Sequence, residues 1–234
     1  MFHAHQSPDS PSPDRNRLAT EAHAALKAAI IRGELQPRER LYGTVIAKHL
    51  KMSRTPVREA LRVLVSEGLA EVKPDGLYVR ALTVQDVREL EQANRALQSM
   101  AAELAASTGS DSDMEALEEL TAHMEACAQK HDANGWVAVD QKIRRHLLQM
   151  AGNRWITQLL LQLEPLIGRV HHISFRRPGR MEQSTCEHRS IVDAVKSRDA
   201  KAARQAMHEH LLLVEQNVIE ILETFVVPWE GDRL

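Results

Sequence analysis

Three arginines at helical spacing are the residues of this chain whose type and position predict a chemistry most directly. Arg54, Arg58 and Arg62 lie four residues apart, so in an α-helix their side chains would share one face. Guanidinium groups arranged in this way can reach the phosphates and base edges of DNA. A solvated charged face on an ordinary amphipathic helix is the competing interpretation, and the flanking sequence decides between the two.

The same segment has the pattern of a short, capped, amphipathic helix. Ser53 is a typical N-cap residue, and Pro56 falls in the first turn, where the missing N–H costs little. Apolar residues recur at helical spacing and are predicted to face a core, at Val57, Leu61, Leu64 and Val65.

A second helix and a tight turn are predicted directly before this one. Residues 41–50 favour a shorter helix with Val45, Ile46 and Leu50 facing inward, and residues 51–52 form the turn that follows. A helix, a short turn and a capped basic helix in succession follow the plan of a helix-turn-helix.

A wing is predicted after the basic helix. Residues 70–72 and 77–79 alternate as short strands around a turn that contains Gly76. Upstream, residues 18–32 show helical periodicity. The sequence therefore predicts a winged helix-turn-helix domain over residues 15–80, whose basic helix enters the major groove of DNA.

The stretch from Ile30 to Val79 resembles the DNA-binding domain of GntR-family transcription regulators. The resemblance rests mainly on the string SRTPVREAL at residues 53–61, with support from Glu67-Gly68-Leu69 and from Gly76. It implies contacts to a double-stranded DNA operator from Arg40, Thr44, Ser53, Arg54, Thr55, Pro56, Arg58, Arg62 and Gly76.

The charge is divided unequally along the chain. The formal net charge is −2, but residues 15–80 contain 13 Lys and Arg against 7 Asp and Glu, whereas residues 81–234 contain 17 against 23. A basic module joined to an acidic one fits a domain that binds a polyanion, followed by a domain with another role.

Composition indicates a cytoplasmic protein. The two cysteines, Cys127 and Cys186, form no disulfide framework and no zinc-ribbon spacing. No apolar run reaches the roughly 18 residues that a membrane span requires, so no membrane partner is expected. Residues 1–14 are rich in Pro, Ser, Asp and His and lack the pattern of a signal peptide, so we expect a disordered arm.

The second half, residues 84–226, is predicted to be an all-α helical bundle. Thr83 and Asp86 form a pattern similar to a capping box, and Pro165 should kink one helix. Helical patterns cover residues 84–106, 111–131, 134–151, 154–175, 180–197 and 199–225. The predicted fold class is mainly α, with an N-terminal winged helix-turn-helix and a C-terminal bundle.

This half resembles the FCD effector domain, the ligand-binding and dimerisation bundle of one large GntR subfamily. The resemblance is carried by the order and spacing of four blocks, at residues 95–98, 140–153, 187–194 and 198–211. It implies a central cavity that holds a small effector.

Many FCD domains hold a divalent metal, of zinc or nickel type, with one Asp and three His, and the resemblance assigns Asp140, His188 and His210 to that set. The fourth position is Arg144, whose guanidinium cannot ligate a metal and would repel one. His146 lies about 240° around the helix from Asp140 and is a poor substitute. A metal held by three residues and water stays one alternative.

An organic acid is the other alternative for this cavity. The resemblance places Arg95 beside the metal-site positions, so the expected effector site comprises Arg95, Asp140, Arg144, His188 and His210. Arginine forks suit carboxylates, although Arg95 could instead pair with a glutamate of the bundle. The other interior histidines, His171, His172 and His208, are expected to be hydrogen-bonded scaffold.

These observations predict a homodimeric transcription repressor that binds an inverted-repeat operator and responds to a small carboxylate effector. Two alternatives remain at this point. One is a metal-dependent hydrolase that uses Asp140, His188 and His210, although no glycine-rich phosphate loop, GxSxG or HExxH motif occurs. The other is an architectural DNA-binding dimer without a ligand.

Overall fold

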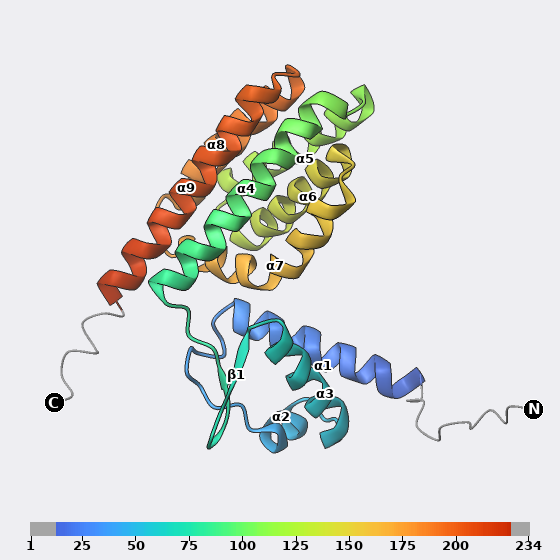
Figure 1. The fold of residues 1–234 in the computed structure, drawn as a ribbon, viewed down its shortest axis with the longest axis vertical. Coiled ribbons are helices and arrows are strands. Elements are labelled where there is room, and N and C mark those ends of the chain that lie inside the picture. Colours follow the sequence, from blue (N-terminus) through green and yellow to red (C-terminus); the bar gives the residue numbers. More distant parts are fainter. Residues whose placement is uncertain (1–12, 226–234) are drawn as a thin grey trace, which may run out of the picture. The chain divides into compact units, whose positions relative to one another are not determined.

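The computed structural model describes residues 13–225, which divide into two compact units between Ala81 and Leu82 (Figure 1). The N-terminal unit is a winged helix-turn-helix, and the C-terminal unit is a helical bundle, as predicted. The predicted disordered arm lies outside the described residues, except that residues 13–14 begin the first helix. Within the described range, no strand follows the wing.

The N-terminal unit has its elements in the predicted order, namely α1 (Pro13–Ile31), α2 (Gly43–His49), α3 (Arg54–Ser66), β1 (Ala70–Lys73) and β2 (Gly76–Val79). The strands pair antiparallel with Ala70 opposite Val79 and Lys73 opposite Gly76. Arg40 forms a further antiparallel bridge with Tyr78, which fixes the chain before α2 along the wing.

Helix α3 is anchored by the apolar face that the sequence predicted. Val57 and Leu64 are fully buried, and Leu61 is nearly so. Helix α1 contacts α3 and contributes the buried side chain of Ile30. Burial of each such side chain stabilises the fold by roughly 1.5–3 kcal/mol. Because these apolar side chains hold α3 against the core, the polar side chains of the helix are turned toward solvent.

One local prediction for this unit is wrong. Val45 was expected inside but is 64% exposed, because the seven-residue α2 buries only one narrow stripe and Ala47 occupies it. Val45 lies about 200° around the helix from Ala47, on the opposite side. Ser53 holds the N-cap position of α3, as predicted, although its side chain makes no capping hydrogen bond.

The bundle consists of α4 (Val84–Thr108), α5 (Asp111–Gln129), α6 (Ala133–Ala151), α7 (Arg154–Ser174), α8 (Arg180–Lys196) and α9 (Ala200–Phe225). The predicted helices agree with these bounds to within two residues at every end. Pro165 lies inside α7, which continues across it. Helices α4 and α9 lie side by side along the bundle (Figure 1).

Local capping signals explain why these helices begin and end where they do. Thr83 and Asp86 form the capping box predicted for α4. Gly152 ends α6 in the left-handed conformation (φ 61°), where glycine has no Cβ penalty. Asn153 then caps α7 by accepting hydrogen bonds from the backbone N–H groups of Trp155 and Ile156.

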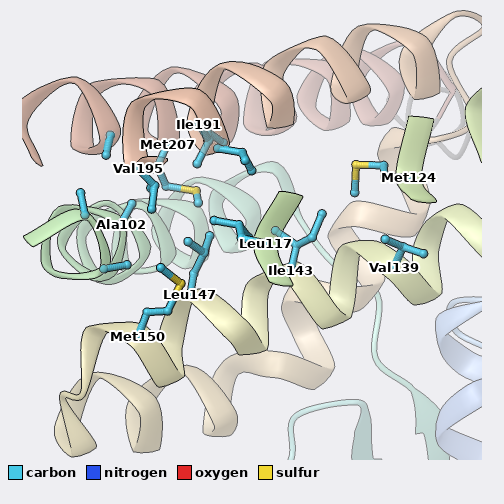
Figure 2. Close-up of a cluster of buried hydrophobic side chains, with 14 of the residues drawn as sticks. Ala102, Leu117, Met124, Val139, Ile143, Leu147, Met150, Ile191, Val195 and Met207 are labelled. Atoms are coloured by element: carbon cyan, nitrogen blue, oxygen red, sulfur yellow. The ribbon is translucent and has the colours of Figure 1, made fainter. Parts of the chain in front are cut away.

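A methionine-rich apolar core fixes the helices of the bundle relative to one another (Figure 2). Leu117 of α5 is fully buried, and Ile143 of α6 and Ile191 of α8 are 1% exposed. Together with Met207 of α9, these side chains fix the registers of four helices. Among the described helices, none is both long enough and apolar enough to cross a membrane.

Candidate functional site

A hollow of about 420 Å³ on the N-terminal unit gathers most of the residues predicted to contact DNA. Its wall is formed by the start of α2, the start of α3 and the wing. The predicted residues that line it are Arg40, Thr44, Arg54, Thr55, Arg58 and Gly76. No acidic side chain lines this hollow among the described residues, so its wall favours a polyanion.

Helix α3 presents its arginines to solvent. Arg54, Arg58 and Arg62 are all exposed, whereas Val57 and Leu64 of the same helix are fully buried. Within the described residues, none of the three guanidinium groups has an ion pair or a hydrogen bond. They are therefore available for phosphate or base contacts without breaking an existing interaction.

Arg40 links the wing to the same hollow. Its guanidinium lies 4.9 Å from the centroid of the Tyr42 ring, and it hydrogen-bonds the backbone carbonyl of Asp75 in the wing turn. A Cβ on Gly76 would lie 2.7 Å from Arg40 Nε, so glycine permits this close approach. The sequence reasoning missed Tyr42, which is 53% exposed in the wall of the hollow.

Three of the predicted DNA-contact residues lie elsewhere. Pro56 is buried in the first turn of α3, so its ring serves the packing of the helix. Ser53 and Arg62 are exposed but do not line the hollow. Arg62 continues the arginine row one turn farther along α3, where a phosphate could still reach it.

A second, buried site lies inside the bundle, where Asp140 of α6, His188 of α8 and His210 of α9 meet. All three side chains are at most 4% exposed, and the rings of His188 and His210 have centroids 4.6 Å apart. The cavity that they line has a volume of about 10 Å³, which is enough for about one water molecule.

The carboxylate of Asp140 contacts two side chains, Arg144 and His188. Its Oδ2 lies 2.8 Å from Arg144 on the same helix, and its Oδ1 lies 3.0 Å from His188 Nε2. Burial alone would raise the pKa of Asp140, but the charge of Arg144 and the hydrogen bond from His188 outweigh it and hold the pKa well below its usual range. Asp140 is therefore ionised under ordinary conditions.

His188 faces an oxygen acceptor on each side of its ring. Nδ1 donates to the carbonyl oxygen of Ser184 at 2.8 Å, and Nε2 faces the carboxylate of Asp140. These two contacts fix the orientation of the imidazole, and each ring nitrogen already has an oxygen atom within hydrogen-bond distance.

His210 belongs to a second buried ion-pair network. Its Nδ1 donates to Glu187 Oε2 at 2.6 Å, and Arg180 donates to both oxygens of that carboxylate at 2.8 Å. Burial, with a smaller contribution from the charge of His188, lowers the pKa of His210 to about 4. His210 is thus neutral near pH 7 and fixed in orientation by Glu187.

His171 is the cavity residue that the sequence reasoning misassigned to the scaffold. It lines the cavity from α7, and its buried Nε2 has no hydrogen-bond partner among the residues that the structure describes, as is also true of the Ser174 hydroxyl. Burial and the charge of Arg144 lower the pKa of His171 well below its ordinary value. Unpartnered buried polar atoms of this kind are those that a water or ligand would satisfy. By contrast, His208 is exposed.

Arg95 does not line the cavity. Its guanidinium pairs with Glu215 of α9 at 2.5 Å. This contact agrees with the alternative that Arg95 pairs with a glutamate of the bundle. On the same helix, Glu91 is fully buried, and one of its carboxylate oxygens has no hydrogen-bond partner within the described part of the chain. Burial raises the pKa of Glu91 to about 7, and the hydrogen bond from Asn94 only partly opposes this.

The residues of the cavity do not fit the divalent metal that FCD domains can bind. Both oxygens of Asp140 are engaged, and a permanent guanidinium charge lies 2.8 Å from one of them. Among the described residues, no group of three or more His, Cys, Asp or Glu is arranged to hold a metal ion. His146 hydrogen-bonds the carbonyl oxygen of Asp113, away from the cavity.

The chain matches two family descriptions. Residues 18–78 match "Bacterial regulatory proteins, gntR family", and residues 81–213 match "FCD domain". The chain therefore belongs to the GntR family of bacterial transcription regulators and has an FCD domain. It is accordingly a DNA-binding regulator and not an enzyme.

Similar proteins cover nearly the whole chain. The transcriptional regulator YdhC of Bacillus subtilis is 28% identical over 204 residues, which are 86% of this chain and 89% of the relative. The transcriptional repressor GlaR of Escherichia coli is 29% identical over 196 residues, 80% and 89% of the two chains. The solved structure of E. coli McbR/YncC has a TM-score of 0.72 at 25% identity and covers 88% of this chain and 97% of its own. GlaR is named a repressor and YdhC a transcriptional regulator.

Proposed function

We propose that this protein is a homodimeric repressor that binds an inverted-repeat operator through the hollow between α2, α3 and the wing. The observation that carries the proposal is the acid-free wall in which Arg40, Arg54 and Arg58 come together. The arginines at the start of α3 would contact base edges and phosphates in the major groove. Arg40 and the wing would contact the adjoining backbone.

Two copies of the chain are needed because one such domain makes few contacts. A single small module buries too little surface for tight specific binding, and helix-turn-helix proteins therefore read two half-sites as dimers. The two-fold symmetry of a dimer requires an operator with inverted half-sites. The bundle is the part of the chain proposed to dimerise.

The buried cavity is the proposed effector site, and the proposed effector is a small organic acid. Arg144 does not line this cavity in its present form but contacts Asp140, which does. On opening, Arg144 would give up that contact and pair with the carboxylate of the acid, while His171 and Ser174 would satisfy their unpartnered atoms on it. Because the cavity now holds about one water molecule, binding requires the helices around it to open.

The need for the bundle to open supplies a mechanism by which an effector would control operator affinity. An effector changes operator affinity only if it binds one conformation of the protein better than another. An acid that fits only the opened bundle meets this condition, and a typical coupling of about 1–3 kcal/mol would change operator affinity by roughly 5–150-fold.

The experiment begins with selection of bound sequences from a randomised duplex library, which identifies the operator. Fluorescence anisotropy then measures operator affinity with and without each acid of a panel. Thermal denaturation of the protein with the same panel reports binding independently of DNA. An acid that raises the melting temperature and changes operator affinity supports the proposal. If the chain selects no sequence, operator recognition is refuted; if no acid binds, the ligand-free architectural alternative is favoured.

A further inference from the structure

A groove on the outside of the bundle adjoins the buried cavity. It lies between the start of α6 and the turn that joins α7 to α8, and its volume is about 390 Å³. Small-molecule sites typically have volumes of about 300–1,000 Å³, whereas the buried cavity holds about one water molecule. The groove is therefore the one of these two spaces that admits an organic molecule without a rearrangement.

The walls of the groove combine an apolar surface with a free cation. Trp136 and Phe175 stack edge to face with centroids 4.7 Å apart, and Met181 extends the apolar wall. Arg176 is exposed at the rim, and no described residue forms an ion pair or hydrogen bond with its side chain. Aromatic walls with a few placed polar groups are typical of small-molecule sites.

The other charged side chains of the groove differ in their partners. Arg177 contacts Asn217 and pairs with Glu220 at 2.8 Å, whereas Glu182, the acid in the wall, is exposed and lies 3.4 Å from the exposed His131. Helix α8 also begins here, with Gly179 at the N-cap and no side chain capping it, so its first N–H groups and its dipole favour an anion. Arg176 and this helix start make the groove selective for negative charge.

We propose that this groove is a second ligand site, which takes an organic carboxylate with an apolar body. The carboxylate pairs with Arg176 near the start of α8, and the body packs against Phe175 and Met181, behind which the buried Trp136 contacts Phe175. The site is separate from the buried cavity, and its occupation does not require the Arg144–Asp140 ion pair to break.

A shared wall would connect this site to the buried cluster. Trp136 lines both spaces, donates its Nε1–H to Thr185 at 2.8 Å and packs edge-on against His188. Arg180, which orients Glu187 and through it His210, also lines both. A ligand that shifts Trp136 therefore acts directly on the cavity.

Trp136 is the natural reporter for the test. The chain has three tryptophans, so the double substitution Trp155→Phe and Trp229→Phe leaves Trp136 as the sole tryptophan, which is excited selectively over the two tyrosines at long wavelength. Titration of this full-length protein with 3-phenylpropionate should give a saturable change in fluorescence at millimolar concentrations or below. Succinate, which has charge but no apolar body, should bind at least about tenfold more weakly.

Variants in the same background identify the residues responsible. Arg176→Gln should weaken binding about tenfold or more because a charge-assisted contact is lost. Ala133→Phe places a ring in the groove from an exposed position and should abolish the response. Arg88→Gln removes the same charge from an exposed site on α4 and should leave binding unchanged. Circular dichroism establishes that each variant is folded.

The proposal is overturned if 3-phenylpropionate gives no saturable response, or if Arg176→Gln and Ala133→Phe bind it as tightly as the parent does. It is also overturned if succinate binds equally well, since the apolar wall would then contribute nothing. None of these measurements involves operator DNA, so they are independent of the proposed repressor function.

Discussion

Arg144 and Asp140 form a buried ion pair across one turn of α6, with 2.8 Å between the guanidinium nitrogen and the carboxylate oxygen. The side chain of Asp140 is 4% exposed and that of Arg144 is 18% exposed, so solvent screens their interaction only weakly. Breaking a buried pair by removing one partner typically costs about 3–5 kcal/mol. The pair thus fixes the cavity in the form described and occupies the carboxylate that a metal would need.

The first prediction concerns metal content. Elemental analysis of protein purified without chelator should find well below one metal per chain. Arg144→His should raise the affinity for zinc, because side chains at i and i+4 share a helix face and imidazole is a good zinc ligand. The same substitution should weaken binding of a small carboxylate effector, because the bidentate fork is lost.

Arg144→Gln is the matched control for this experiment. It removes the same charge but supplies no strong ligand, so zinc affinity should remain below that of Arg144→His. A stoichiometric metal in the unmodified protein, held by Asp140, His188 and His210, would contradict the role given to Arg144.

The second prediction concerns pH and rests on Glu91. A carboxyl whose pKa is raised to about 7 on folding takes up a proton when the chain folds. Its contribution to stability is therefore fully present below the unfolded value of about 4.5 and decreases as the pH rises through about 7. Glu91→Gln, which retains the shape but cannot ionise, should stabilise the protein by about 1–3 kcal/mol at pH 8 and much less at pH 5.

Chemical denaturation at the two pH values measures this difference. Glu119→Gln, on the exposed side of α5, serves as the control and should change stability little at either pH. Equal effects of Glu91→Gln at pH 5 and pH 8 would show that Glu91 does not titrate in this window.

The third prediction concerns assembly. Light scattering should give the mass of a dimer, and footprinting should show protection of two inverted half-sites with centres about one helical turn of DNA apart. A monomer in solution that protects one asymmetric half-site would be incompatible with the proposed symmetry.

The helix boundaries could be predicted because their signals are local. Thr83 with Asp86, and Gly152 with Asn153, specify where a helix starts or stops from a few neighbouring residues. Val45 shows the limit of this reasoning, because a two-turn helix presents too few apolar residues to define which side is buried.

Which residues meet at the buried cavity of the bundle depends on packing between residues that are far apart in the sequence. The position of Arg144 in the chain identified its partner Asp140, since i and i+4 side chains meet on one helix. The partner of Arg95, by contrast, is Glu215, which lies 120 residues away on another helix. His171 was missed for the same reason, because periodicity shows that a residue is interior but not which cavity it faces.

The central claim is that the arginines at the start of α3 bind the operator, and the double substitution Arg54→Ala with Arg58→Ala tests it most directly. Arg17→Ala with Arg32→Ala removes the same charge from an exposed position on α1 and from the exposed turn directly after it, and is the control. Anisotropy titration with the selected operator is the measurement, and circular dichroism verifies folding. If each arginine contributes at least about 1 kcal/mol, the α3 variant should lose about 30-fold or more in affinity, and the control much less. Unchanged operator affinity in a folded α3 variant would contradict the account.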